Sequence, residues 1–218
     1  MILAAGRGER MRPLTDILPK PLQKVGDLTL IERHVTALAK AGIKHIVINL
    51  AWLGHLIEQH LGDGARFNLN IDYSYEQTAL GTLGGVVNAL TLFKEEQFLV
   101  ISADIVTDFD FHSLLSHSID SHDLAHLVLI EESHFKGDFS LQSHRVTMPE
   151  AQSFTYGNIG LYQRRGLMHF QPGQILDLGQ YLRQLVGLNQ VSGQLFSGLW
   201  SNVGTIEELD RINQLLDK

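Results

Sequence analysis

Helical and strand-like patterns alternate along the first half of the chain. Apolar residues recur at helical spacing over 28–41, and a glycine then ends that pattern. A run rich in β-branched residues over 45–50 predicts a buried strand, and a helical pattern follows it over 52–61. Alternation over 71–75 predicts a further strand. With the apolar stub 1–4 in front, this half indicates a β-α-β-α-β order.

The same alternation continues to about residue 132. The spacing predicts helices over 84–92 and 112–118, and the apolar runs 98–102 and 125–132 are typical of fully buried strands. Strands that alternate with helices imply a largely parallel sheet with helices on both faces, an α/β fold. Ligands of such sheets bind at the carboxyl ends of the strands.

The segment from Phe135 to Tyr162 has a different character. Its short alternating runs and turn residues predict a small subregion of antiparallel pieces that lie over the sheet. Beyond it, the spacing predicts a helix over 175–186 and a terminal helix over 205–216. Thr205 is the expected N-cap of the terminal helix, with Glu208 as its capping-box partner.

Composition narrows the class of protein. The 218 residues fit one large α/β domain, so we expect a single domain over 1–218. A formal net charge of −7 argues against nucleic acids and membrane surfaces as partners, because both are anionic. Without cysteine there is no disulfide framework and no thiolate metal site. The sequence shows neither a membrane span nor the layout of a signal peptide, so we expect a cytoplasmic location.

The strongest chemical signal is the stretch MILAAGRGERMRPLT at 1–15, together with LPKPL at 18–22. An apolar strand stub runs into Gly6 and Gly8, where the backbone can turn tightly and point several N–H groups at an anion. Because Met1 lies only five residues before Gly6, we expect a residue or two of the first strand upstream of it. Fixed positive charge is added by Arg10, Arg12 and Lys20. The stretch predicts a cradle for a nucleoside triphosphate, and the alternative is an ordinary strand-to-helix turn.

Two other phosphate loops do not fit this stretch. The Walker loop needs Gly-Lys-Ser/Thr at its end, whereas Gly8 is followed by Glu9-Arg10-Met11. The dinucleotide fingerprint needs a third glycine at the position of Met11. Neither a P-loop nor a Rossmann dinucleotide site is therefore predicted.

An apolar strand over 98–103 delivers the carboxylate of Asp104 at its carboxyl end. Mg²⁺ keeps several waters and takes one or two protein carboxylates together with substrate phosphates. Asp104 is therefore a candidate magnesium ligand, and the alternative is an aspartate that caps a helix or a turn.

The compound motif, Gly-x-Gly-x-Arg with Pro13-Leu14-Thr15 and Pro19-Lys20-Pro21, resembles the signature of sugar-1-phosphate nucleotidyltransferases. The resemblance covers nearly the whole chain. It implies the Rossmann-like nucleotide-diphospho-sugar transferase fold, with the segment 135–162 on the sugar side. It also implies an enzyme that uses Mg²⁺ to transfer a nucleoside monophosphate from a triphosphate to a sugar 1-phosphate, with release of pyrophosphate.

By this resemblance, the residues of the motifs acquire expected roles. The nucleotide is expected to contact the opening loop at Ala5, Gly6, Gly8, Glu9 and Arg10. Its base is expected under the loop 76–85, where Gly84 and Gly85 allow close approach. The expected catalytic residues are Arg10 at the β- and γ-phosphates, Lys20 at the α-phosphate and the sugar phosphate, and Asp104 at Mg²⁺. The expected sugar-substrate contacts are Lys20, Ser102 and Asp138, although Asp138 also fits a surface turn after Gly137.

The chain departs from the family pattern at three positions. The run LWSNVGT at 199–205 stands where relatives carry Trp-x-Asp-Val-Gly-Thr, so Asn202 replaces the second metal-ligand aspartate. An amide oxygen carries no charge, so weaker metal binding is expected. Ser102 stands where close relatives have asparagine, and Asn158 where they usually have glycine. These departures keep open a catalytically weak nucleotide-sugar-binding or regulatory protein.

Further runs favour one branch of the family. These runs are NLAWLG at 49–54, LGDG at 61–64, GDF at 137–139 and VSG at 191–193. They look most like the uridylyltransferase branch that acts on N-acetylmuramate 1-phosphate in cell-wall recycling. UTP and that sugar phosphate are therefore the expected substrates. Mannose-1-phosphate guanylyltransferase and glucose-1-phosphate thymidylyltransferase specificities remain alternatives. A sugar-transferring glycosyltransferase would need an Asp-x-Asp pair, which 108–110 supplies, but it has no use for the triphosphate loop.

Overall fold

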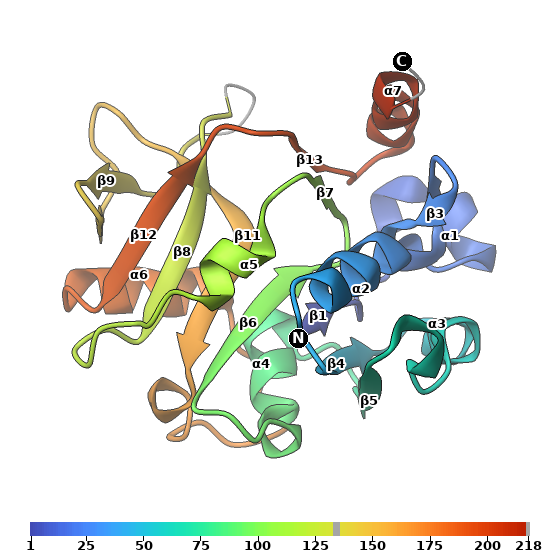
Figure 1. Cartoon of the computed structure of the whole chain (residues 1–218), viewed down its shortest axis with the longest axis horizontal. Coiled ribbons are helices and arrows are strands. Elements are labelled where there is room, and N and C mark those ends of the chain that lie inside the picture. Colours follow the sequence, from blue (N-terminus) through green and yellow to red (C-terminus); the bar gives the residue numbers. More distant parts are fainter. Residues whose placement is uncertain (133–135, 217–218) are drawn as a thin grey trace.

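The computed structural model describes residues 1–132 and 136–216, and a mixed sheet forms its centre (Figure 1). Within the described residues this sheet has nine strands in the order β5-β4-β1-β6-β11-β8-β12-β10-β9. The strands are β1 (Ile2–Leu3), β4 (His45–Leu50), β5 (Asn70–Tyr75), β6 (Gln97–Ser102), β8 (Ala125–Ile130), β9 (Ser140–Gln142), β10 (Arg145–Thr147), β11 (Thr155–Gln163) and β12 (Val191–Phe196).

Most strands of the described sheet run in one direction, as predicted, although only four of its eight neighbouring pairs are parallel. Strands β5, β4, β1 and β6 are parallel to one another, and β12 is parallel to β8. Strand β11 runs antiparallel to both β6 and β8, and β10 and β9 complete the edge as antiparallel strands. The parallel strands β4, β1 and β6 therefore end at one edge of the sheet.

Strand β11 corrects the prediction for the segment that follows residue 135. The segment is antiparallel, as expected, but β11 lies in the middle of the sheet rather than over it. The cause is that β11 carries apolar residues on both faces. Ile159 and Leu161 face one core, whereas Tyr156 and Tyr162 face the other. Phe135, the expected start of the segment, lies outside the described residues.

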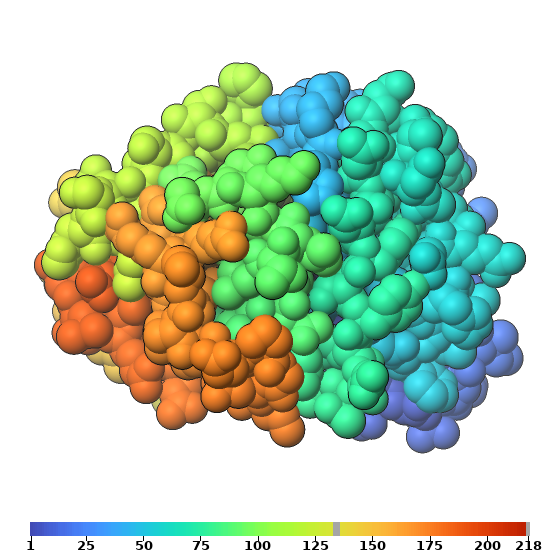
Figure 2. Space-filling model, turned by 90° about the horizontal axis from the view of Figure 1, so that it is seen from below, coloured from blue at the N-terminus to red at the C-terminus, as the bar shows by residue number. Residues whose placement is uncertain are grey.

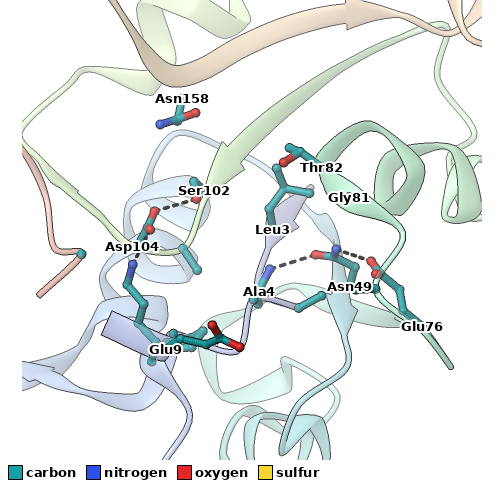
Figure 3. Close-up of a pocket in the computed structure, with 18 of the residues that line it drawn as sticks. Leu3, Ala4, Glu9, Asn49, Glu76, Gly81, Thr82, Ser102, Asp104 and Asn158 are labelled. Atoms are coloured by element: carbon teal, nitrogen blue, oxygen red, sulfur yellow. Dashed lines mark hydrogen bonds and ion pairs between the residues drawn. The ribbon is translucent and has the colours of Figure 1, made fainter. Parts of the chain in front are cut away.

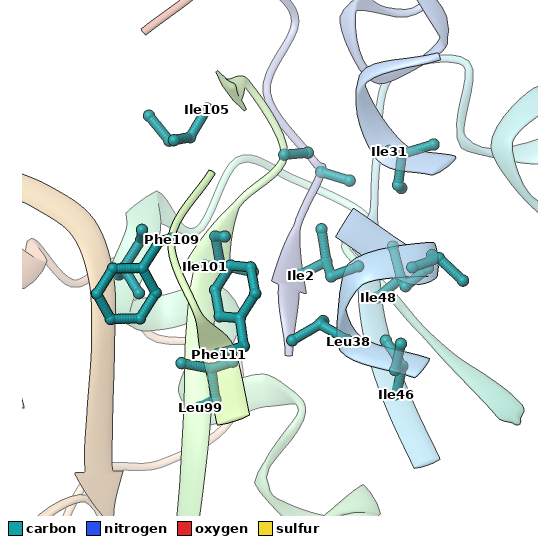
Figure 4. Packing of buried hydrophobic residues seen from close by; sticks show 14 of the residues in the cluster. Ile2, Ile31, Leu38, Ile46, Ile48, Leu99, Ile101, Ile105, Phe109 and Phe111 are labelled. Atoms are coloured by element: carbon teal, nitrogen blue, oxygen red, sulfur yellow. The ribbon is translucent and has the colours of Figure 1, made fainter. Parts of the chain in front are cut away.

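Helices cover both faces of the sheet. The first face packs against α2 (Leu30–Lys40), α3 (Gly54–Leu61) and α5 (Phe111–Leu115). The second packs against α4 (Gly81–Asn88) and α6 (Leu178–Gly187). In β6, Leu99 and Ile101 face the first core and Phe98 and Val100 the second, which is the period of two that a strand imposes. Figure 4 shows Ile101 in the first core with Ile2 and Ile48 of the neighbouring strands.

Capping side chains explain where several helices begin. Helix α2 begins at Leu30 rather than at 28, because the Thr29 hydroxyl accepts a hydrogen bond from the Glu32 amide at 3.2 Å and caps it. Helix α6 begins at Leu178 rather than at 175, because Asp177 caps it through the Gln180 amide at 2.6 Å. The predicted helices over 52–61, 84–92 and 112–118 are α3, α4 and α5 with bounds shifted by a few residues.

The terminal helix α7 (Ile206–Leu216) confirms its predicted cap. The Glu208 amide donates to the Thr205 hydroxyl at 3.2 Å, and the Thr205 amide donates to the Glu208 carboxylate at 2.9 Å. Leu209 and Ile212 bury this helix in a third, smaller core with Val25 and Val106.

Several short elements were not predicted from the pattern. Two two-stranded sheets pair β2 (Lys24–Val25) with β3 (Leu28–Thr29) and β7 (Ile105–Thr107) with β13 (Trp200–Asn202). The other short elements are η1 (Glu9–Met11), α1 (Leu14–Ile17), η2 (Lys20–Leu22), η3 (Ala65–Phe67), η4 (Leu90–Leu92) and η5 (Arg164–Gly166). Of the helices that the structure describes, none has the length and apolar character needed to cross a membrane.

The buried face of β6 generates a stability prediction. Ile101 is fully buried, whereas Ile17 of α1 is 81% exposed. We expect Ile101→Ala to lower the free energy of unfolding by about 2–5 kcal/mol, because it removes buried methyl groups and leaves a cavity. The matched change Ile17→Ala should alter it by less than about 0.5 kcal/mol. Urea denaturation of both variants measures the difference, and equal losses would contradict the core assignment.

Candidate functional site

A cavity of about 570 Å³ opens at the carboxyl ends of the parallel strands (Figure 3). The loop after β1, the ends of β4 and β6, and the loop after β5 all contribute to its wall. Its lining residues are Leu3, Ala4, Ala5, Gly6, Gly8, Glu9, Arg10, Lys20, Pro21, Asn49, Glu76, Ala79, Leu80, Gly81, Thr82, Ser102, Ala103, Asp104, Asn158 and Gly204. The structure thus brings the expected triphosphate loop, Lys20, Ser102 and Asp104 to one place.

The glycine loop is held in a conformation that few other residues adopt. Gly8 has a φ of 69°, in the left-handed region, and a β carbon there would lie 3.0 Å from Thr15 and 3.1 Å from Lys20. The Thr15 hydroxyl also donates a hydrogen bond to the Gly8 carbonyl at 2.9 Å. At Gly6, by contrast, an added β carbon would meet nothing within 4 Å. Gly6 therefore leaves open space beside the backbone, and Gly8 allows the tight turn.

An ion pair joins the loop region to the end of β6. Lys20 Nζ lies 2.5 Å from Asp104 Oδ2, and the two side chains are only 12% and 24% exposed. The Ser102 hydroxyl donates a hydrogen bond to the other oxygen of Asp104 at 2.6 Å. A cation, a carboxylate and a hydroxyl are thus fixed together on the cavity wall.

The arginines of the loop take different positions. Arg10 lies against Gly204. A β carbon added at Gly204 would stand 2.5 Å from the Nη2 atom of Arg10, so the absence of a side chain at Gly204 makes room for the guanidinium. Arg12 was expected to add charge to the cradle, but it is absent from the described cavity lining and pairs instead with Asp16 at 3.0 Å. Arg7 stacks over Trp52, 3.8 Å from the ring centre.

A chain of hydrogen bonds connects the two loops on either side of the cavity. Asn49, which is buried, accepts from the Ala4 amide at 2.9 Å and donates to the Glu76 carboxylate at 2.7 Å. Glu76 in turn accepts from the Leu80 amide at 3.3 Å. Asn49 was not predicted as a site residue, although a polar residue near the end of an apolar strand is the signal that could have found it.

The structure does not bring Gly84 and Gly85 into the cavity lining. An added β carbon at Gly84 would stand 2.4 Å from the Gln174 carbonyl oxygen, and at Gly85 it would stand 2.5 Å from the Glu76 carboxylate. Both glycines therefore serve close packing of α4. The preceding residues 79–82 line the cavity instead, and the segment 171–177 supports them through the Leu176 amide, which donates to the Leu80 carbonyl. In Figure 2 this orange segment lies against the green one that contains α4.

A second cavity of about 280 Å³ adjoins the first, because Thr82 and Asn158 line both. Asn158 has a φ of 55° at a bulge of β11, a conformation that glycine and asparagine tolerate best. Asp138 lines this second cavity, where its carboxylate accepts from the Tyr156 amide at 2.9 Å. Burial raises the pKa of the Tyr156 phenol, which is therefore neutral.

Asn202 lines the second cavity on a strand next to Asp104. It pairs with Ile105 across β13 and β7, and the following amide of Val203 donates to the Asp104 carbonyl at 2.9 Å. Its Oδ1 atom is buried and has no hydrogen-bond partner among the described residues. Buried polar atoms without a partner are rare, so this oxygen is a candidate ligand atom.

Other titratable side chains that could take part in catalysis or metal binding lie outside these cavities or carry no charge. Among residues 1–132 and 136–216, no three His, Cys, Asp or Glu side chains form a metal-binding group. Asp108 and Asp110 line neither cavity, and Asp110 instead caps α5 through the His112 amide. Burial lowers the pKa of His34 to about 4, so this ring near Asp104 carries no charge at neutral pH.

Comparison with known sequences gives consistent matches. The family profile described as nucleotidyl transferase matches residues 1–137. The chain is 43% identical to the N-acetylmuramate alpha-1-phosphate uridylyltransferase of Neisseria meningitidis, in an alignment that covers 99% of this chain and 96% of that enzyme.

Solved structures with the same fold span nearly the whole chain. One, assigned as a glucose-1-phosphate thymidylyltransferase from Bacillus anthracis and solved with sucrose, has a TM-score of 0.86 at 21% identity and covers 98% of this chain and 93% of that chain. HddC from Yersinia pseudotuberculosis, complexed with GMP-PN, has a TM-score of 0.81 at 17% identity. The match covers 99% of this chain and 97% of HddC. These likenesses confirm the predicted fold class.

The geometry of Gly8 generates a test with a matched control. Gly8→Ala and Gly26→Ala both place a β carbon on a residue with positive φ, at a cost of about 1–2 kcal/mol of stability each. At Gly26 the new carbon meets nothing within 4 Å, whereas at Gly8 it presses on Thr15 and Lys20. We expect only Gly8→Ala to weaken binding of a nucleoside triphosphate, by about tenfold, as measured by titration calorimetry. Equal affinities in the two variants would show that the Gly8 turn does not shape the site.

Proposed function

The chain is an enzyme of the nucleotidyl transferase family, whose members transfer nucleotides to sugar 1-phosphates, and we propose that its substrates are UTP and N-acetylmuramate 1-phosphate. In the proposed reaction an oxygen of the sugar phosphate attacks the α-phosphorus of UTP. A new phosphorus–oxygen bond forms as the bond to pyrophosphate breaks, so UDP-N-acetylmuramate and pyrophosphate are released. This proposal rests mainly on the cavity in which the glycine loop, Arg10 and the Lys20–Asp104 pair converge.

The choice of substrates rests on the full-length relative. At 43% identity over 99% of the chain, the uridylyltransferase of Neisseria meningitidis matches this chain over both cavities. Mannose-1-phosphate guanylyltransferases are less similar, and that of Mycobacterium tuberculosis is 31% identical over 53% of this chain. The size of the first cavity is also typical of sites for small molecules.

Charge neutralisation is the main task that this site would perform. Both substrates are polyanions, and neither the attacking oxygen nor the leaving group needs to lose a proton at neutral pH. We assign Arg10 to the β- and γ-phosphates and Lys20 to the α-phosphate and the sugar phosphate. The backbone amides around Gly6 and Gly8 supply further fixed donors. No general base is therefore needed.

We assign the base to the first cavity and the sugar to the second. The loop 79–82 would hold uracil through its main chain, with Ala5, Gly6 and Glu9 on the facing loop. The sugar would occupy the second cavity, where Asp138 lies, with Ser102 near the boundary on the first cavity's wall.

Asp104 and Asn202 fit a divalent cation, which we propose to be Mg²⁺. Asp104 directly precedes β7, and Asn202 pairs with Ile105 at the start of β7. They present a carboxylate and an unpaired amide oxygen, and oxygen atoms are the ligands that Mg²⁺ prefers. The Asp104 oxygens retain lone pairs beyond their bonds to Lys20 and Ser102. When bound there, the cation would add positive charge beside the phosphates.

A pyrophosphate-release assay tests the proposed function. It combines UTP, dTTP or GTP with N-acetylmuramate 1-phosphate, glucose 1-phosphate or mannose 1-phosphate in the presence of Mg²⁺. We expect the largest kcat/KM for UTP with N-acetylmuramate 1-phosphate. Because Asn202 lacks a charge, a catalytically weak nucleotide-sugar-binding protein is the second candidate, and binding without turnover of any pair would support it.

Loss of the positive charge of Lys20 should affect the reaction rate far more than the fold. Lys20→Ala removes a charge fixed beside Asp104, and we expect kcat to fall by about 100- to 1,000-fold. Lys24→Ala changes an exposed lysine four residues away and should leave kcat unchanged. The same assay measures both, with circular dichroism to verify folding, and similar rates in the two variants would refute the role of Lys20.

Restoring the family aspartate should improve the metal site. Asn202→Asp adds a charge to the ligand set, so we expect a lower half-saturating Mg²⁺ concentration and a higher rate. Asn68→Asp at an exposed turn is the matched control for the change in net charge. A lower rate in Asn202→Asp, with the control unchanged, would show that the amide of Asn202 has another task.

A further inference from the structure

Arg183 is a cation in the wall of the second cavity that the reaction as described does not use. It belongs to α6, and among the described residues that line this cavity it is the one cationic side chain. The other charged groups of the wall are the carboxylates of Asp138 and Asp177. The cavity is therefore not built simply to attract anions.

The two carboxylates are engaged, whereas the guanidinium is not. Asp138 accepts from the Tyr156 amide at 2.9 Å, and Asp177 accepts from the Gln180 amide at 2.6 Å. No side chain or carbonyl within 1–132 or 136–216 forms an ion pair or hydrogen bond with Arg183. Its donors thus remain available for a ligand in the cavity.

The guanidinium of Arg183 lies beside Gly179. An added β carbon at Gly179 would stand 3.4 Å from Arg183 Nη1 and 3.3 Å from Asp177 Oδ1. Both charged groups therefore lie close to the glycine, which also lines the cavity. A side chain at this position would crowd the guanidinium beside the cavity.

We propose that Arg183 binds the carboxylate of the lactyl ether of N-acetylmuramate 1-phosphate and so selects this acidic sugar. The inference rests on the proposed function, because it presumes that the sugar occupies the second cavity. The lactyl ether is the group that N-acetylglucosamine lacks, and its carboxylate is the only charge of the sugar apart from the phosphate. Arginine presents donors that match a carboxylate in a two-point contact.

The position of Arg183 favours the carboxylate over the sugar phosphate as its partner. The phosphate must meet the α-phosphorus in the first cavity, where Lys20 and Arg10 lie. Arg183 lines only the second cavity, as do Asp138 and Asp177. It is thus a specificity residue at the far side of the sugar.

The test compares two sugar phosphates in one assay. Pyrophosphate release is measured with UTP and either N-acetylmuramate 1-phosphate or N-acetylglucosamine 1-phosphate, for wild type, Arg183→Ala, Arg183→Lys and Gln184→Ala. Arg183→Ala should lower the ratio of kcat/KM values, acidic over neutral sugar, by about 10- to 100-fold, chiefly through KM. Arg183→Lys should retain part of the ratio. Gln184 is exposed next to Arg183 but outside the cavity, so Gln184→Ala should keep the wild-type ratio.

A binding measurement secures the result if the neutral sugar reacts too slowly. The dissociation constants of UDP-N-acetylmuramate and UDP-N-acetylglucosamine should move closer together in Arg183→Ala by the same factor. An unchanged ratio in Arg183→Ala, whether both sugars weaken or neither does, overturns the role of Arg183 and leaves the proposed function standing. Absence of turnover of N-acetylmuramate 1-phosphate by the wild type overturns the proposed function itself.

Discussion

The contact between Lys20 and Asp104 ties together parts of the chain that are 84 residues apart. Lys20 follows the glycine loop, and Asp104 follows the central strand β6, so the pair sets how far the loop stands from the sheet. Both side chains are largely shielded from water, and either one alone would leave a partly buried charge without a partner. Because the pair lies on the cavity wall, the same contact that holds the loop would, in the proposed reaction, also present the Lys20 ammonium to an incoming phosphate.

The parallel sheet is what makes this contact possible. Strand β1 lies between β4 and β6, so the residues that follow these strands meet at one edge. On one side of β1 the meeting residues are Lys20 and Asp104, and on the other Asn49 joins the loop backbone to Glu76. The glycine loop is therefore held from both neighbouring strands, and its amides are fixed before any ligand arrives, which favours electrostatic stabilisation of a transition state.

Much of this arrangement could be predicted from the sequence, because it depends on local patterns. Strong periodicity located α2, β4, β6 and β8, and the glycines with their neighbouring cations located the first cavity. The limits lie in contacts between distant segments. The position of β11 in the middle of the sheet depends on partners far along the chain, and the short strands β7 and β13 carry too few residues to show a period. One local contact was also missed, because the pattern of glycines and cations does not show that Arg12 pairs with Asp16, four residues further on.

A crystal structure of the protein with UTP and Mg²⁺ tests the account most directly. The account predicts the triphosphate on the main-chain amides of residues 5–10, with Lys20 within hydrogen-bond distance of the α-phosphate and uracil against residues 79–82. A nucleotide bound outside this cavity, with the amides of the glycine loop free, would contradict it.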